Sequence, residues 1–175
     1  MRVLLIDDHA LFREGLVALL ERRRVKVIAA VGDAEQGRLL IEEHQPDVVL
    51  LDLRMPGTNG NEFLRQLSRE KPDLPVVILT TSAEQNDLAE CLRNGARGYL
   101  LKDMEPDELM FALRAIERGD TVVAPGLTGA LASIVKNGNS SEITETTSPF
   151  KALTRRELEI LCHLSEGQSN KVIAR

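Results

Sequence analysis

The sequence is poor in aromatic residues, in cysteine and in long hydrophobic runs. It has no tryptophan, one tyrosine and four phenylalanines, which argues against binding nucleic acid by aromatic stacking. Its two cysteines, Cys91 and Cys162, are far apart and in no CxxC pair, so we expect reduced thiols in a cytoplasmic protein. The opening apolar run is too short for a signal peptide, and no run is long enough to span a membrane. The net charge of -5 gives no global sign of nucleic-acid binding.

Short apolar runs alternate with helical patterns over the first part of the chain. The clearest run is Val48 to Leu51, whose four consecutive apolar residues are typical of a strand buried on both faces. Helices are indicated by apolar stripes, and by Asn94-Gly95 and Gly119 where two of them end. The predicted strands lie at residues 3–6, 25–31, 48–51, 76–79 and 98–101. This alternation predicts an α/β fold, with a parallel sheet and helices on both of its faces.

Three segments of the chain differ in pattern. Residues 1–120 carry the α/β pattern and form the first predicted domain. Residues 121–149 are interpreted as a linker with room for one helix at 126–136, because their last part is rich in Ser, Thr, Asn and Glu. Residues 150–175 regain a helical pattern, opened by a capping box at Thr154 and Glu157. The last segment is therefore predicted to be the beginning of an all-α domain.

Polar side chains stand where four of the predicted strands end: Asp7 and Asp8, Asp52, Thr80 and Lys102. The carboxyl ends of parallel strands meet at one edge of a sheet, so these side chains are expected to converge. Taken singly, each has an ordinary explanation, such as a helix cap for Asp7 and Asp8 or a solvated surface lysine for Lys102. Asp8 or His9 could cap the helix that follows the first strand. The joint placement of these polar side chains at the ends of four strands favours a functional site.

The chemistry of such a cluster follows from its charges. Clustered carboxylates repel one another unless a cation or a proton relieves them, and Mg²⁺ commonly binds to one or two carboxylates. Asp52 is then a candidate nucleophile that accepts a phosphoryl group as an aspartyl phosphate. Lys102 and Thr80 offer an ammonium and a hydroxyl to the phosphoryl oxygens.

Three motifs together resemble the receiver domains of two-component response regulators, and they are most similar to the NarL/FixJ subfamily. The motifs are LIDDH at residues 5–9, LLDLRMPG at 50–57 and GYLLKD at 98–103. The segments LTRRE at 153–157 and NKVIAR at 170–175 resemble the start of the LuxR-type helix-turn-helix domain of that subfamily. The resemblance implies a flavodoxin-like, doubly wound, five-stranded parallel sheet with strand order 2-1-3-4-5, followed by a linker and an incomplete helix-turn-helix domain.

The resemblance also assigns a phosphorylation site. It implies that Asp52 is the phosphoacceptor and takes its phosphoryl group from a sensor histidine kinase. Asp8 and Asp52 would bind Mg²⁺ directly, together with the backbone carbonyl of Arg54, and Asp7 would bind it through water. The protein would catalyse only its own phosphorylation and dephosphorylation, and would otherwise not be an enzyme.

The resemblance further implies a switch. Lys102 and Thr80 would stabilise the phosphoryl group, Thr80 would turn toward it, and Tyr99 would rotate inward behind Thr80. These movements would rearrange the face built from residues 84–118. In the subfamily, this change releases the DNA-binding helices, and the protein dimerises on DNA.

Two departures from the family pattern qualify this interpretation. Asn61 stands where the family usually has an apolar residue, and Arg54 and Ser82 occupy positions that could tune attack by water on the phosphoaspartate. In addition, the sequence stops inside what resembles the first helix of the helix-turn-helix pair. We therefore expect no DNA-binding residues in this chain, and DNA contact only through a complete output domain. Residues 150–175 are expected to be poorly ordered, or docked on the receiver or on a neighbouring chain.

Other functions remain open at this point. An Mg²⁺-dependent phosphatase with an aspartate nucleophile typically needs a second aspartate two residues later, where this chain has Arg54. A nucleotide- or flavin-binding module would need a glycine-rich turn after the first strand, where this chain has Asp7-Asp8-His9. A stand-alone receiver that acts through protein contacts alone is the third alternative.

Overall fold

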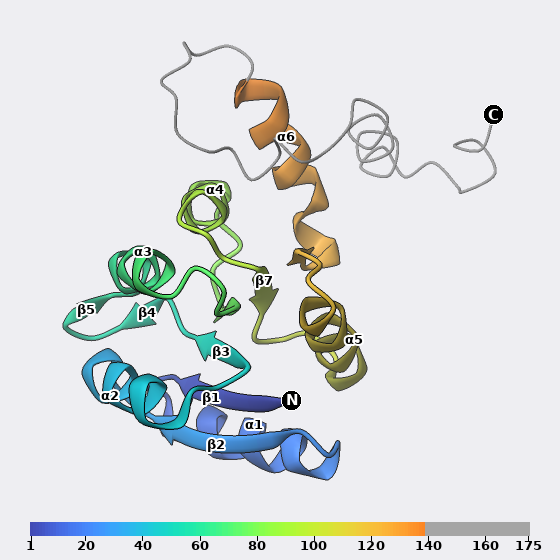
Figure 1. The fold of residues 1–175 in the computed structure, drawn as a ribbon. Helices are drawn as coiled ribbons and strands as arrows, with labels where there is room; N and C mark the ends of the chain where they lie inside the picture. The colour runs from blue at the N-terminus through green and yellow to red at the C-terminus, as the bar shows by residue number, and fades with distance from the viewer. Residues whose placement is uncertain (139–175) are drawn as a thin grey trace.

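The computed structural model describes residues 1–138, which form a twisted parallel sheet with helices on both sides (Figure 1). The strands of this sheet are β1 Arg2–Ile6, β2 Lys26–Val31, β3 Val48–Leu51, β6 Val76–Thr80, β7 Gly98–Leu101 and β8 Val122–Val123. A small hairpin is made by β4 Arg54–Met55 and β5 Thr58–Asn59. The helices are α1 Ala10–Arg22, α2 Ala34–His44, α3 Gly60–Glu70, α4 Gln85–Arg93, α5 Pro106–Glu117 and α6 Thr128–Gly138, with a 3-10 turn at Pro125–Leu127.

The strand order of the sheet is β2-β1-β3-β6-β7-β8. The first five strands confirm the predicted doubly wound parallel sheet with order 2-1-3-4-5, and every pairing within it is parallel. β3 lies at the centre, where Leu50 pairs with Leu5 of β1 and with Val77 of β6. β8, whose two residues extend the sheet beside β7, was not predicted from the sequence.

The hydrophobic core consists of two layers, one on each face of the sheet. On one face, Leu16 of α1 and Leu113 of α5 pack with Leu50 and Leu79. On the other face, α2, α3 and α4 contribute Ile41, Leu64, Leu67, Leu88 and Leu92, which pack against Leu4, Val49, Leu51 and Ile78. Alternate residues of the same strand therefore enter opposite layers, which explains why the central strands are apolar at every position.

The start of α3 lies directly against the segment that follows β3. The Asn59 side chain caps this helix and accepts hydrogen bonds from the backbone N–H groups of Asn61 at 3.0 Å and Glu62 at 3.4 Å. Next to the cap, Gly60 packs so closely that a Cβ there would lie 2.7 Å from the Cα and the carbonyl oxygen of Leu53. The glycine thus allows the α3 backbone to approach the residue that follows Asp52.

Helix α6 packs against α4 and continues the core beyond the predicted first domain (Figure 1). Ala124 and Leu127 are buried, and Leu131 and Ile134 pack against the layer that contains Leu88. The helix spans Thr128–Gly138, where the sequence pattern left room for one at 126–136. The remainder of the predicted linker and the predicted helical segment 150–175 lie outside the described residues. No helix within residues 1–138 is both long and apolar enough to cross a membrane.

Candidate functional site

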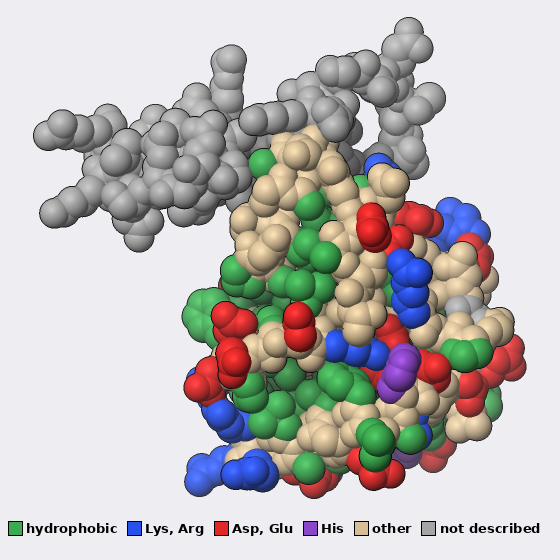
Figure 2. Space-filling view, turned by 180° about the vertical axis from the view of Figure 1, so that it is seen from behind, with side chains coloured by type: hydrophobic (Ala, Val, Ile, Leu, Met, Phe, Trp, Pro, Cys, Tyr) green, Lys and Arg blue, Asp and Glu red, His purple; other side chains and the backbone are tan. Residues whose placement is uncertain are grey.

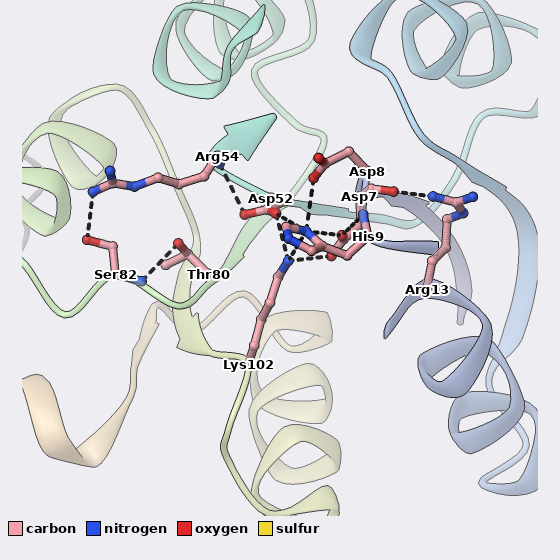
Figure 3. Close-up of polar contacts among 9 residues, drawn as sticks. All are labelled: Asp7, Asp8, His9, Arg13, Asp52, Arg54, Thr80, Ser82 and Lys102. Atoms are coloured by element: carbon pink, nitrogen blue, oxygen red, sulfur yellow. Dashed lines mark hydrogen bonds and ion pairs between the residues drawn. The ribbon is translucent and has the colours of Figure 1, made fainter. Parts of the chain in front are cut away.

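Four strand ends bring the predicted polar residues to one edge of the sheet (Figure 3). Asp7 follows β1, Asp52 follows β3, Thr80 ends β6 and Lys102 follows β7. Parallel ladder bonds align these ends, since the Asp52 N–H donates to Ile6 and the Lys102 N–H donates to Thr80, each at 2.9 Å. Asp7, Asp52 and Thr80 are buried. The convergence expected from the strand pattern is therefore present in the structure.

Lys102 joins two of the carboxylates through its ammonium group. Its Nζ lies 2.6 Å from Oδ2 of Asp52 and 2.9 Å from Oδ2 of Asp7. Burial alone would lower the pKa of Lys102, but the attraction of Asp52 and Asp7 outweighs it and the pKa is raised. The ring of Phe12 lies 4.8 Å below the ammonium and adds a cation–π contact. Lys102 is therefore a permanently charged partner of the two aspartates at neutral pH.

The carboxylates retain oxygen atoms that no hydrogen bond satisfies. Oδ2 of Asp7, which meets Lys102 only as an ion pair, and Oδ1 of Asp8 are buried without a hydrogen-bond partner. Ligand atoms of Asp7, Asp8, His9 and Asp52 all lie within 4.8 Å of one another. Buried carboxylate oxygens whose negative charge is only partly matched by one ammonium suit a hard divalent cation. The residues present thus fit a metal ion, and the donor set includes the three aspartates predicted from the sequence.

His9 belongs to this cluster, although its position in the sequence indicated only a helix cap. It does occupy the position before α1, but its side chain makes no capping hydrogen bond. Its Nδ1 instead lies 3.0 Å from Oδ1 of Asp8 and 3.4 Å from Oδ1 of Asp7. The only signal for this role in the sequence was the position of His9 directly after two aspartates.

Thr80 and Tyr99 are linked through Ser82, in the segment that leads from β6 to α4. The Ser82 N–H donates to the hydroxyl of Thr80 at 3.1 Å, and the Tyr99 hydroxyl donates to the Ser82 carbonyl at 3.0 Å. Tyr99 is fully buried, and burial raises the pKa of its hydroxyl. Tyr99 therefore already occupies the inward position that the resemblance associates with the phosphorylated protein.

Arg54 extends from β4 away from the aspartates and toward Ser82 (Figure 3). Its backbone N–H donates to Oδ1 of Asp52 at 3.1 Å. Its guanidinium contacts Asp87 at 2.9 Å and Ser82 at 3.3 Å, and the Ser82 hydroxyl donates to the same Asp87 oxygen at 2.6 Å. Asp87 lies in the first turn of α4. The segment after Asp52 is thus connected to α4, a link that the sequence analysis did not anticipate.

Asn61, the first departure from the family pattern, has a specific partner in the structure. The Sγ of Cys91 on α4 lies 3.0 Å from its side-chain oxygen and donates a hydrogen bond to it. Burial raises the pKa of the Cys91 thiol to about 12, so the thiol remains protonated and able to donate. Where the family usually has an apolar contact at the start of α3, Asn61 therefore makes a hydrogen bond that joins α3 to α4.

A shallow apolar groove adjoins the acidic cluster. On the face of the molecule seen in Figure 2, hydrophobic side chains lie next to a group of acidic, basic and histidine side chains. The groove has a volume of about 320 Å³ and runs between α1 and the segment that joins β7 to α5. Its lining includes Leu11, Leu19 and Met104, as well as Lys102. Lys102 therefore borders both the acidic cluster and an apolar surface.

The fold and the strand-end cluster define a receiver, and the chain belongs to the response regulator receiver domain family, which matches residues 3–114. It is a two-component response regulator of the NarL/LuxR type. It is 36% identical over 176 residues to the oxygen regulatory protein NreC of Staphylococcus haemolyticus (strain JCSC1435), covering 99% of this chain and 81% of that protein.

Solved structures agree with this assignment. A LuxR-family two-component response regulator from Aurantimonas sp. SI85-9A1 matches with a TM-score of 0.70 and 31% identity, over 80% of this chain and 98% of that one. The response regulator ChrA of a heme-sensing two-component system matches with a TM-score of 0.63 and 36% identity, over 99% of this chain and 79% of that one. Regulators of this type act as transcription factors and not as classical enzymes.

Proposed function

We propose that Asp52 accepts a phosphoryl group from a sensor histidine kinase and that this modification controls a transcriptional output. The observation that carries the proposal is the environment of the Asp52 carboxylate. It is only 2% exposed, directly follows the central strand, and lies 2.6 Å from the ammonium of Lys102. A carboxylate held at a strand end beside a fixed cation is placed to act as a nucleophile on a negatively charged group.

The transfer exchanges one bond to phosphorus for another. The P–N bond of the phosphohistidine breaks, a P–O bond to an Asp52 carboxylate oxygen forms, and the departing imidazole nitrogen takes up a proton. Lys102 compensates the charge of the phosphoryl oxygens. The Thr80 hydroxyl, which now accepts a hydrogen bond from Ser82, turns to donate to one of those oxygens.

The acidic cluster supports a magnesium site next to the acceptor. Asp8, Asp52 and the backbone carbonyl of Arg54 would hold Mg²⁺ directly, and Asp7 would hold it through water. Bound Mg²⁺ supplies positive charge to the phosphoryl oxygens. The proposal is supported by the buried oxygens of Asp7 and Asp8 that have no hydrogen-bond partner.

The output side of the proposal is a rearrangement of the face built from residues 84–118. Movement of Thr80 toward the phosphoryl group removes the acceptor of the Ser82 N–H. Ser82 is hydrogen-bonded to both Tyr99 and Asp87, so its displacement reaches β7 and α4.

We expect the phosphorylated protein to dimerise, and DNA to be bound through a complete output domain. Light scattering after gel filtration measures the dimer, and a fully phosphorylated monomer would contradict this step.

The acceptor is tested by the mass of the intact protein. After incubation with Mg²⁺ and acetyl phosphate, the wild-type protein is expected to gain one phosphoryl group. The Asp52→Asn variant has no carboxylate to attack phosphorus and is expected to gain none. Asp103→Asn is the matched control, because Asp103 is exposed and follows Lys102 without joining the acidic cluster. A phosphoryl adduct on Asp52→Asn, or its absence from the wild type, would refute the proposal.

A further inference from the structure

The imidazole of His9 faces the same three aspartates as the proposed magnesium site, yet phosphoryl transfer at Asp52 assigns it no role. Its Nδ1 lies 3.0 Å from Oδ1 of Asp8, 3.4 Å from Oδ1 of Asp7 and 3.6 Å from Oδ2 of Asp52. These three oxygens come from the ends of β1 and β3. A single ring nitrogen is therefore surrounded by carboxylates from two strands.

The spacing of these atoms, which is that of ion pairs between an imidazole and carboxylates, is also compatible with ligands around one ion. An octahedral ion with ligands at about 2.1 Å places neighbouring ligand atoms about 3.0 Å apart and opposite ones about 4.2 Å apart. The three distances from Nδ1 fall within this interval. Moreover, Oδ1 of Asp8 has no hydrogen-bond partner even though Nδ1 is so close. The two atoms thus converge without the geometry of a hydrogen bond.

A ring nitrogen of His9, added to the oxygens of the three aspartates, changes which ion the cluster prefers. Mg²⁺ takes oxygen ligands and gains little from an imidazole, whereas first-row transition ions bind imidazole well, in the order Mn²⁺ < Co²⁺ < Ni²⁺ < Cu²⁺. We propose that His9 is a direct ligand, through Nδ1, of a first-row divalent transition ion held by Asp7, Asp8 and Asp52. This inference rests on the proposed function, because the ion occupies the place of the proposed Mg²⁺.

The charges around His9 are compatible with such an ion. The nearest cation is the ammonium of Lys102, 3.5 Å from Nδ1. It is already paired with Oδ2 of Asp7 and with Oδ2 of Asp52, the same Asp52 oxygen that lies 3.6 Å from Nδ1. Oδ1 of Asp7 faces His9 and accepts a hydrogen bond from its backbone N–H at 2.9 Å. Since three carboxylates face one ammonium, the cluster has negative charge left to offset a divalent ion.

Calorimetric titration of the full chain with Ni²⁺, and separately with Mg²⁺, tests the preference at one fixed pH. The His9→Gln variant removes the ring nitrogen at a position where the side chain is 61% exposed and makes no capping bond, so the fold is retained. We expect its affinity for Ni²⁺ to fall by about tenfold or more, the scale of loss seen when metal sites lose a supporting partner. Its affinity for Mg²⁺ is expected to stay unchanged.

A second readout identifies the ligand atom. Pulsed electron paramagnetic resonance of bound Mn²⁺ detects the coupling of a directly coordinated imidazole nitrogen. The wild type is expected to show this coupling and His9→Gln to lack it. The other two histidines of the chain provide matched controls: His44→Gln and His163→Gln should both keep it. Nitrogen coupling that persists in His9→Gln, or equal Ni²⁺ affinity in both proteins, would overturn the inference.

The two hypotheses fail in different ways. If Mg²⁺ supports the Asp52 adduct but no nitrogen coupling appears, His9 is not a ligand and the proposed function stands. If the wild type binds neither Mg²⁺ nor Ni²⁺ at this cluster, both the metal site and the role of His9 are refuted. If nitrogen coupling appears but no adduct forms, the ligand assignment stands and the phosphoacceptor does not.

Discussion

Replacing Gly60 by alanine is expected to lower the free energy of unfolding by about 2–3 kcal/mol, the upper part of the usual range of about 1–3 kcal/mol for overpacking. The added Cβ would lie 2.7 Å from the Cα and the carbonyl oxygen of Leu53 and 3.0 Å from the carbonyl oxygen of Asp52. All of these are backbone atoms, which cannot rotate away as a side chain does. The segment after β3 must therefore shift, and we expect slower phosphorylation of Asp52 as well.

The matched control for this substitution is Gly15→Ala. Gly15 lies within α1, and a Cβ there would meet no atom within 4 Å. Alanine at this position should raise the free energy of unfolding by about 0.5–1 kcal/mol, because glycine is the poorer helix former. Urea unfolding of both variants followed by circular dichroism measures the two effects. Equal stability of Gly60→Ala and the wild type would show that the approach of α3 to Leu53 is not a constraint.

Replacing Lys102 by methionine is expected to have the second large effect. The lysine side chain is only 8% exposed, and the side chains of its partners Asp7 and Asp52 are 1% and 2% exposed. Removal of the ammonium leaves buried carboxylates without their cation, which costs about 3 kcal/mol or more in other proteins. We expect a matching loss of stability in a metal-free buffer, and loss of the phosphoryl adduct.

A divalent cation should offset part of that loss. A ligand that binds only the folded state stabilises it by about 2.7 kcal/mol at a concentration of 100 times its dissociation constant. Thermal unfolding of Lys102→Met with and without Mg²⁺ measures this offset, and Lys71→Met, at a lysine whose ion pair is with Glu42 on another surface, is the control. Lys71→Met keeps the acidic cluster and its ammonium, so Mg²⁺ should stabilise it less than Lys102→Met. Equal stabilisation of the two variants would show that the cation does not compensate for the missing ammonium.

The raised pKa of Lys102 also determines how its contribution varies with pH. A group whose pKa is higher in the folded state stabilises that state fully below its unfolded pKa, which is about 10.4 for lysine. The stabilisation is lost as the pH rises through the higher folded value. The difference in stability between the wild type and Lys102→Met should therefore show no decline due to Lys102 near neutral pH, and should shrink only in alkaline solution.

Strand ends could be predicted from the sequence because continuous apolar runs mark buried parallel strands. Asp52 and Lys102 directly follow such runs, so their convergence needed only the parallel topology. β8 could not be predicted, since two residues carry no periodic pattern. β8 forms only because its two residues pair with β7 at the edge of the sheet, a contact that the local sequence does not encode.

The hydrogen bonds between side chains of different helices and strands also could not be predicted from the sequence. The contact of Arg54 with Asp87 joins residues 33 positions apart, and the bond between Asn61 and Cys91 joins residues 30 positions apart. Neither residue type nor spacing marks such a pair before the helices are placed. His9 was overlooked for a different reason: its position before a helix already had a sufficient explanation in the capping of that helix.

The isolation of Tyr99 has a consequence for optical spectroscopy. The chain has one tyrosine and no tryptophan, so its phenol-type ultraviolet absorption and emission come from this ring alone. That ring is fully buried, and its hydroxyl is bonded to the carbonyl of Ser82. This chain thus contains a single phenol chromophore, which lies in β7 against the segment that leads to α4, and the phenol spectrum of the chain reports on that position without any added label.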